Sequence, residues 1–205
     1  SDLVGTVRAM VFERRCAACR TPGPSPCARC IDQLRVEGDV EVAGLDRCLA
    51  VVAYDDISRR LVADLKYRGV RGAVTWMVAA MAACITAAGE HPDVVTWVPA
   101  APANRRRRGF DQAEMLGRRL ARALEVPAIE VARRRRGASQ TGKNRRQRLG
   151  GPDVVPNTRW SARPIPAQIA LIVDDVTTTG ASLEAVARVL GPDVRSVGLV
   201  FAHSR

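Results

Sequence analysis

The segment LIVDDVTTTGAS, residues 171–182, most strongly constrains how this chain folds. Aliphatic residues run into two adjacent aspartates, and three threonines and a glycine follow before a helical pattern begins. An apolar strand that leads through a short polar turn into a helix is the repeating unit of a parallel sheet covered by helices. Ligands of such sheets bind in the loops beyond the carboxyl ends of the strands. The segment therefore predicts a fold class and the edge of the sheet that carries the function.

The rest of the chain repeats this alternation of strands and helices. Runs rich in aliphatic residues predict strands over residues 49–54, 93–98, 128–132, 169–173 and 194–202. Apolar residues at helical spacing, with glycines as stop signals, predict helices over residues 56–67, 74–88, 111–124 and 183–190. We therefore predict an α/β fold with a mostly parallel sheet flanked by helices. Residues 41–205 form this domain, and residues 1–40 form a small zinc-ribbon-like segment before it.

Neither a membrane span nor an export signal is apparent in the sequence. The alanine-rich stretch 74–88 is shorter than the roughly 20 apolar residues that a membrane helix needs, and it reads as a buried helix. The first ten residues, SDLVGTVRAM, lack the basic, apolar and cleavage regions of a signal peptide. We therefore expect a cytoplasmic protein without a membrane span.

Four of the six cysteines lie within 15 residues, as Cys16-x2-Cys19 and Cys27-x2-Cys30. A Cys-x2-Cys pair lets two thiolates reach one ion from a tight turn, and two such pairs complete a tetrahedral zinc site. Four thiolates leave no open position for chemistry, so this zinc would be structural. Disulfides are the competing interpretation, although a reducing compartment disfavours them. Free structural thiols are the third.

The net charge of +11 is concentrated in one part of the chain. Residues 103–150 contain 15 basic and 4 acidic side chains, and the remaining residues contain 17 of each sign. The excess lies in three blocks, at residues 105–108, 133–136 and 143–148. Such a concentration indicates a polyanionic partner, either a nucleic acid or a phosphorylated metabolite. A solvated loop in an arginine-rich protein is the alternative, since the chain has 30 Arg and 2 Lys.

The polar turn of the 171–182 segment has the donors of a phosphate site. The helix start directs backbone N–H groups at one point, and the hydroxyls of Thr177–Thr179 and Ser182 add donors. Gly180 permits close approach of the backbone. The preceding carboxylates of Asp174 and Asp175 need hydroxyl donors or a cation such as Mg²⁺. A ribose 5-phosphate satisfies both halves, whereas a turn that only links strand to helix is the alternative.

These residues resemble a known signature. The run VDDVTTTGAS is similar to the phosphoribosyl pyrophosphate motif of type I phosphoribosyltransferases. More narrowly, the chain resembles the ComF (ComFC) competence family. The matching segments are the two cysteine pairs, DLKYRG at 64–69, VPAAPANRRRRGFDQAEMLGRRLA at 98–121 and SQTGKNRRQRLGG at 139–151. The resemblance covers nearly the whole chain and implies a type I phosphoribosyltransferase-like fold.

The resemblance also implies roles for individual residues. Asp174 and Asp175 would hold the ribose hydroxyls, with Mg²⁺ bound by the phosphoribosyl pyrophosphate. The 5-phosphate would bind to Thr177, Thr178, Thr179, Gly180, Ala181 and Ser182. The pyrophosphate loop would span residues 99–104 and include Pro99, Ala100, Ala101 and Pro102. A mobile loop over residues 139–148 would supply three catalytic cations beside the two aspartates, namely Arg145, Arg146 and Arg148.

Two functions are compatible with the resemblance. One is a phosphoribosyltransferase with an acceptor that the sequence does not identify. The other is a non-catalytic protein on the same scaffold that binds single-stranded DNA or a protein partner. The family's role in DNA uptake implies a competence helicase or a recombination mediator as that partner. The chain differs from the usual family pattern at Asp111, where asparagine is usual, and in the AAPAN sequence of the pyrophosphate loop.

Overall fold

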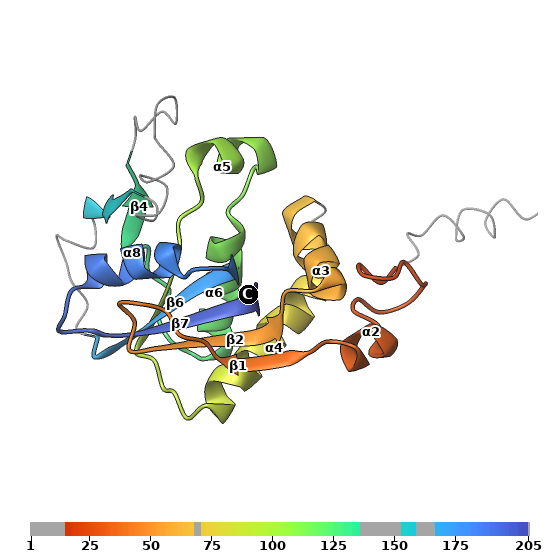
Figure 1. Ribbon diagram of the computed structural model, residues 1–205. Coiled ribbons are helices and arrows are strands. Elements are labelled where there is room, and N and C mark those ends of the chain that lie inside the picture. Colours follow the sequence, from red (N-terminus) through yellow and green to blue (C-terminus); the bar gives the residue numbers. More distant parts are fainter. Residues whose placement is uncertain (1–14, 68–70, 136–152, 159–166, 205) are drawn as a thin grey trace, which may run out of the picture.

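Figure 1 shows the computed structural model, which describes residues 15–67, 71–135, 153–158 and 167–204. The strands are β1 (Val36–Asp39), β2 (Arg47–Ala53), β3 (Val94–Trp97), β4 (Ala132–Arg134), β5 (Val154–Pro156), β6 (Ile169–Thr177) and β7 (Arg195–His203). The helices are α2 (Ala28–Asp32), α3 (Asp56–Tyr67), α4 (Arg71–Ala87), α5 (Pro102–Arg108), α6 (Gln112–Ala123) and α8 (Ala181–Leu190).

Five strands form one sheet in the order β1-β2-β7-β6-β3. The pairs β2–β7, β7–β6 and β6–β3 are parallel, and β1 runs antiparallel along β2 at the edge. Parallel strands require crossovers through helices, so the alternation in the sequence leads to this arrangement. The predicted mostly parallel sheet flanked by helices is confirmed. A separate two-stranded ribbon pairs β4 with β5.

Helices cover both faces of the sheet (Figure 1). On one face, Leu171 and Val173 of β6 share a buried cluster with apolar residues of α3, α4 and α6. On the other face, Ala170 and Ile172 pack with α8. The period-2 alternation along β6 thus supplies both cores, as a strand buried on both faces requires.

The observed elements differ from the predicted ones at several points. Helix α3 has the predicted bounds, whereas β6 continues to residue 177 and includes the paired aspartates. The strand predicted over 128–132 is displaced along the chain. Ala128 makes only an isolated bridge with Val95, and the paired strand in this region is β4, which begins at Ala132. The residues expected as a loop after β3 contain helix α5, which has Pro102 in its first turn. Elements α2, β1 and β5 have no counterpart among the elements predicted from the sequence.

The cysteine-rich segment, residues 16–30, packs against the sheet domain. Cys16 and Cys30 are buried in the same cluster as Leu61 and Leu65 of α3. The Arg60 guanidinium donates a hydrogen bond of 3.1 Å to the Ala18 carbonyl. Strand β1, which precedes the proposed domain boundary at residue 40, belongs to the main sheet. The cysteine-rich segment therefore shares its core with the sheet domain.

No helix in the described parts of the chain is long and apolar enough to cross a membrane. The predicted helix 74–88 is present as α4 and buries one face, which carries Val74, Met77, Met81 and Ile85. Ala79 and Ala83 lie on its exposed side. The alanine content of this stretch thus reflects a helix with one packed face.

An ion-pair network connects the amino-terminal ends of two strands. Glu90 follows α4 and is 8% exposed. Its carboxylate accepts hydrogen bonds from both terminal nitrogens of Arg195 at the start of β7. Arg47 at the start of β2 lies 3.3 Å from the same carboxylate and also donates to the Ala88 carbonyl. The hydrogen bonds from Arg195, and then those from Arg47, hold the pKa of Glu90 below its ordinary value.

We expect Glu90→Gln to lower the free energy of unfolding by about 2 kcal/mol at pH 7, because it leaves two arginines without their shared anion. The folded-state pKa of Glu90 is depressed, so its stabilisation is present above the ordinary pKa of 4.5 and is lost as the pH falls through the lowered value. Urea unfolding of wild type and variant at a series of pH values from 7 to 3 would measure the difference. The exposed carboxylate of Glu41 gives the matched control, Glu41→Gln. A gap between wild type and Glu90→Gln that stays constant with pH would contradict the assignment.

Candidate functional site

The carboxyl ends of β3 and β6 meet and bring two predicted loops together. Trp97 lies opposite Val173 in the parallel register. The Val98 N–H donates to the Val173 carbonyl at 3.0 Å, which continues the pairing by one residue. The chain after β3 therefore passes directly beside the acidic pair of β6. This is the edge at which ligands of parallel sheets bind.

A cavity of about 210 Å³ opens between these strand ends. Residues predicted for the site form part of its lining, namely Pro99, Ala100, Ala101, Asn104, Asp174, Asp175 and Ser182. Its other lining residues are Val98, Arg108, Asp111, Gln112, Ala113 and Arg134. The pyrophosphate-loop candidates and the acidic pair thus share one polar pocket, which lies between the edge strand β3 and the inner strand β6.

The remaining predicted phosphate-binding residues lie beside the pocket. Thr177 is buried, and its hydroxyl oxygen accepts the Gly180 N–H at 3.1 Å. Thr178 and Thr179 are exposed, and the Thr179 hydroxyl oxygen accepts the Ala181 N–H at 3.4 Å. Two of the backbone donors expected to face a ligand therefore bond to threonine side chains. Pro102 begins α5 and does not line the pocket.

The acidic pair is half-buried and locally braced. The Asp174 side chain accepts its neighbour's N–H at 2.8 Å, and the Asp175 side chain accepts the Val176 N–H at 2.9 Å. These bonds fix the carboxylates next to the backbone of an extended strand. Carboxylates fixed in this way suit hydroxyl donors or a hard cation.

Asp111 is a pocket residue that the site prediction omitted. One of its carboxylate oxygens caps α6 by accepting the Glu114 N–H at 3.3 Å, and the other accepts the Ala100 N–H at 2.6 Å. Burial raises the pKa of Asp111. The DQAE sequence is a capping pattern that places this residue at a helix start. The bond to the loop after β3 depends on tertiary structure and leaves no signal in the sequence.

Two arginines and a glutamine complete the polar lining. Arg134 of β4 donates from Nε to the Pro99 carbonyl at 2.8 Å. Burial lowers the pKa of Arg134, and the carboxylates of Asp174 and Asp111 act in the opposite direction. Arg108, the last residue of α5, donates from Nη1 to Gln112 Oε1 at 2.7 Å. The sequence indicated arginine blocks, but it gave no means to tell which members face the pocket.

The β4–β5 ribbon brings residues 135 and 153 together next to Arg134, which lines the pocket. Arg134 pairs with Val154, and the Arg135 guanidinium lies 3.5 Å from the Asp153 carboxylate. The predicted catalytic residues Arg145, Arg146 and Arg148 lie outside the described residues.

Gly180 at the start of α8 has a positive φ of 74°. A Cβ atom at this position would lie 2.2 Å from Val42 Cγ1. Both the backbone conformation and the packed neighbour therefore require glycine. The loop between β1 and β2 thereby packs directly against the turn that follows the acidic pair.

The four clustered cysteines form a second candidate site. Their Sγ atoms all lie within 4.8 Å of one another, with Cys16–Cys30 at 3.8 Å and Cys19–Cys27 at 3.6 Å. All four are free thiols. Four Zn–S bonds of about 2.3 Å in a tetrahedron place sulfur atoms about 3.8 Å apart. The cluster therefore has the geometry to hold one metal ion.

Hydrogen bonds favour the thiolate form at Cys16 and Cys19. The Cys27 N–H donates to Cys16 Sγ at 3.4 Å. The Thr21 hydroxyl, 3.2 Å from Cys19 Sγ, lowers the pKa of that thiol to about 6. Burial raises the pKa of Cys30. A metal ion opposes that burial effect, because a coordinating thiol is deprotonated.

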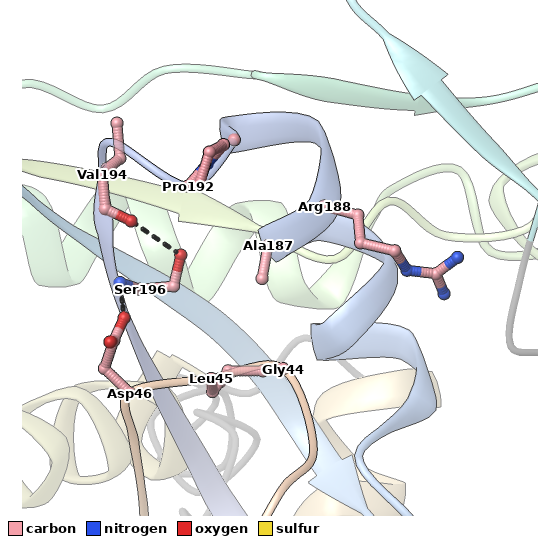
Figure 2. Close-up of a pocket in the computed structure, with 9 residues that line it drawn as sticks. Gly44, Leu45, Asp46, Ala187, Arg188, Pro192, Val194 and Ser196 are labelled. Atoms are coloured by element: carbon pink, nitrogen blue, oxygen red, sulfur yellow. Dashed lines mark hydrogen bonds between the residues drawn. The ribbon is translucent and has the colours of Figure 1, made fainter.

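Two larger hollows lie away from the carboxyl edge of the sheet. Figure 2 shows one of about 520 Å³ at the starts of β2 and β7. Its polar groups bond to one another, since the Ser196 N–H donates to the Asp46 carboxylate at 2.7 Å and the Ser196 hydroxyl lies 3.4 Å from the Val194 carbonyl. The other, of about 580 Å³, is mainly apolar and lies between α2, β1, β2 and α4. Neither unites residues predicted to bind a ligand.

Comparisons with known proteins agree with the resemblance seen in the sequence. The chain is similar to Competence protein F. That protein, from Haemophilus influenzae (strain ATCC 51907 / DSM 11121 / KW20 / Rd), is 32% identical over 104 residues, which cover 48% of this chain and 44% of the relative. The match confirms the resemblance to ComF. This chain spans less than half the length of that curated relative.

No family model matches the chain. Among solved structures, the crystal structure of orotate phosphoribosyltransferase from Aeropyrum pernix covers 82% of this chain and 74% of its own. Its TM-score is 0.42 and its sequence identity is 19%.

Proposed function

We propose that the pocket binds phosphoribosyl pyrophosphate together with Mg²⁺ and that the protein is a phosphoribosyltransferase-like member of a DNA-uptake system. The proposal depends on one observation, that residues from two separate loops line the same cavity. Residues 99–101 after β3 line the same 210 Å³ space as Asp174, Asp175 and Ser182. A ribose 5-phosphate that bears a second anionic group at the other end of the sugar matches the polar groups on both walls.

The chemistry follows from where charge develops. When pyrophosphate departs from C1 of the ribose, negative charge grows on the leaving group and positive charge grows on the sugar. Cations at the β3 side of the pocket stabilise the first. In this proposal Asp174 and Asp175 hold the ribose hydroxyls, and their carboxylate oxygens would suit the Mg²⁺ that the ligand binds. The 5-phosphoribosyl group passes from the departing pyrophosphate to an acceptor nucleophile.

The proposed metal of the cysteine cluster is zinc. Four thiolate ligands at tetrahedral spacing suit a structural zinc ion, and they leave no position for a substrate. Mg²⁺ belongs to the other site, because carboxylate oxygens suit a hard cation and thiolates do not.

Titration calorimetry with phosphoribosyl pyrophosphate and Mg²⁺ tests the ligand. We expect Asp174→Asn/Asp175→Asn to weaken binding by at least about 100-fold, because two charge-assisted contacts to the ribose are lost. The exposed Asp193 lies after α8 at the opposite edge of the sheet, so Asp193→Asn is the matched control. Equal affinity of the wild type and the double variant, or no binding by the wild type, would overturn the proposal.

The proposed biological role follows from the similarity to Competence protein F. We extend a role in DNA uptake to this chain. Single-stranded DNA and a competence helicase or recombination mediator are the proposed partners. Arg105–Arg107 on α5 are exposed near the pocket and are available to a phosphate backbone.

A further inference from the structure

The pocket has two walls that differ in chemistry. The wall on the inner strand β6 and on α8 carries Asp174, Asp175 and Ser182. The wall on the β3 side is made by the loop after β3, by α5 and α6, and by β4, and it contains Arg108, Gln112 and Arg134. The Asp111 carboxylate also lies in this wall, where it accepts the Ala100 and Glu114 N–H groups. The arginines of this wall are the cationic side chains among the described lining residues. An extended ligand with an anionic leaving group therefore has one orientation in which opposite charges meet.

The backbone of the loop after β3 has limited capacity to bind an anion. The Ala100 N–H, which faces this region, is taken by the Asp111 carboxylate at 2.6 Å. Pro99 and Pro102 have no N–H to offer. Side chains of this wall therefore add donors for an anionic group.

Arg134 is fixed by the loop that it faces. The hydrogen bond from Nε to the Pro99 carbonyl sets the plane of the guanidinium. The side chain is half-buried, and a cation in a partly desolvated site attracts phosphate oxygens more strongly than one in water. Its neighbour Arg133 is exposed on the same strand and has the same charge.

The Gln112 side chain gives independent evidence for a ligand oxygen in the pocket. The side chain is 4% exposed, and its Oε1 accepts the bond from Arg108. Its Nε2 is buried and has no hydrogen-bond partner within the described residues. A buried amide N–H without an acceptor is unfavourable, and a ligand oxygen in the adjoining pocket relieves this.

We propose that Arg134 and the Arg108–Gln112 pair hold the diphosphate end of the ligand. Arg134 and Arg108 supply the cations, and Gln112 both orients Arg108 and donates from Nε2. All three residues lie within the described part of the chain. This assignment rests on the proposed function, because it places one end of the same ligand.

Three probes in titration calorimetry separate the ends of the ligand, all with Mg²⁺ present: phosphoribosyl pyrophosphate, inorganic pyrophosphate and ribose 5-phosphate. We expect Arg134→Ala to weaken binding of the first two by about 30-fold and to leave ribose 5-phosphate within about twofold. Arg133→Ala, the matched control, is expected to change none of the three by more than about twofold.

Gln112→Glu provides a second variant that keeps the side-chain shape and the bond to Arg108. It replaces the Nε2 donor by an acceptor and is expected to weaken binding of both diphosphate probes by at least about 30-fold. Circular dichroism of each variant checks that the chain folds.

The outcomes distinguish the two proposals. Wild-type protein that binds none of the probes overturns the proposed function. Wild-type binding of phosphoribosyl pyrophosphate that Arg134→Ala and Gln112→Glu leave unchanged overturns only the assignment of the diphosphate end. An equal loss of all three probes in both variants also overturns it, because such a loss would reflect disruption of the whole pocket.

Discussion

Gly180→Ala is expected to lower the free energy of unfolding by about 3 kcal/mol. A left-handed conformation costs a residue with a Cβ about 1–2 kcal/mol, and overpacking of a well-filled site adds about 1–3 kcal/mol. Both effects apply, because φ is 74° and the new Cβ would lie 2.2 Å from Val42 Cγ1. Urea unfolding of the purified variant measures the loss.

Gly89→Ala is the matched control for this substitution. Gly89 has a φ of 72°, but nothing lies within 4 Å of its Cβ position. It therefore carries the conformational effect without the contact, and we expect a loss of about 1–2 kcal/mol. Val42→Ala added to Gly180→Ala should recover part of the difference. Equal losses at the two glycines would show that Val42 does not restrict Gly180.

Cys16→Ser is expected to abolish binding of one zinc ion per chain and to lower the free energy of unfolding by about 4 kcal/mol or more. Structural zinc contributes its binding free energy to folding. Here the effect extends beyond the turn, because Cys16 is fully buried in a cluster with Leu61 and Leu65 of α3. Metal analysis of the purified protein and thermal unfolding with and without a chelator measure the two parts.

Cys84→Ser serves as the control for loss of a thiol. Cys84 lies on α4, is partly exposed and stands outside the metal cluster. We expect this variant to keep its zinc and to lose about 1 kcal/mol or less. Purified wild-type protein that contains no zinc, or a chelator that leaves the melting temperature unchanged, would contradict a structural zinc site.

Elements with a regular apolar pattern could be predicted closely. Helix α3 has the predicted bounds, and α6 begins and ends within one residue of its prediction. Their hydrophobic residues repeat at helical spacing because one face packs on the sheet. Helix α5 was missed because its four arginines have no apolar period, although Pro102 and the left-handed Gly109 mark its two ends.

Strands whose partners lie far along the chain were less predictable. The sequence VEGD of β1 contains a glycine and two acids and lacks an alternating apolar pattern. It is a strand because its backbone pairs with β2. The predicted strand 128–132 is displaced for a related reason, since Ala132–Arg134 acquires its register from Val154–Pro156. Pairing between distant segments decides both cases.

The parallel sheet, the edge that carries the candidate site, the paired aspartates and the four-cysteine cluster could all be predicted from the sequence. Each of these depends on local order, either an apolar period or a fixed spacing of ligands. The fold was needed to show that Arg134 and Gln112 face the pocket while Arg133 faces solvent, and that Asp111 holds the Ala100 N–H. Those roles depend on which distant segments meet at the ends of β3 and β6, and similar side chains in one charge block give no local signal of that meeting.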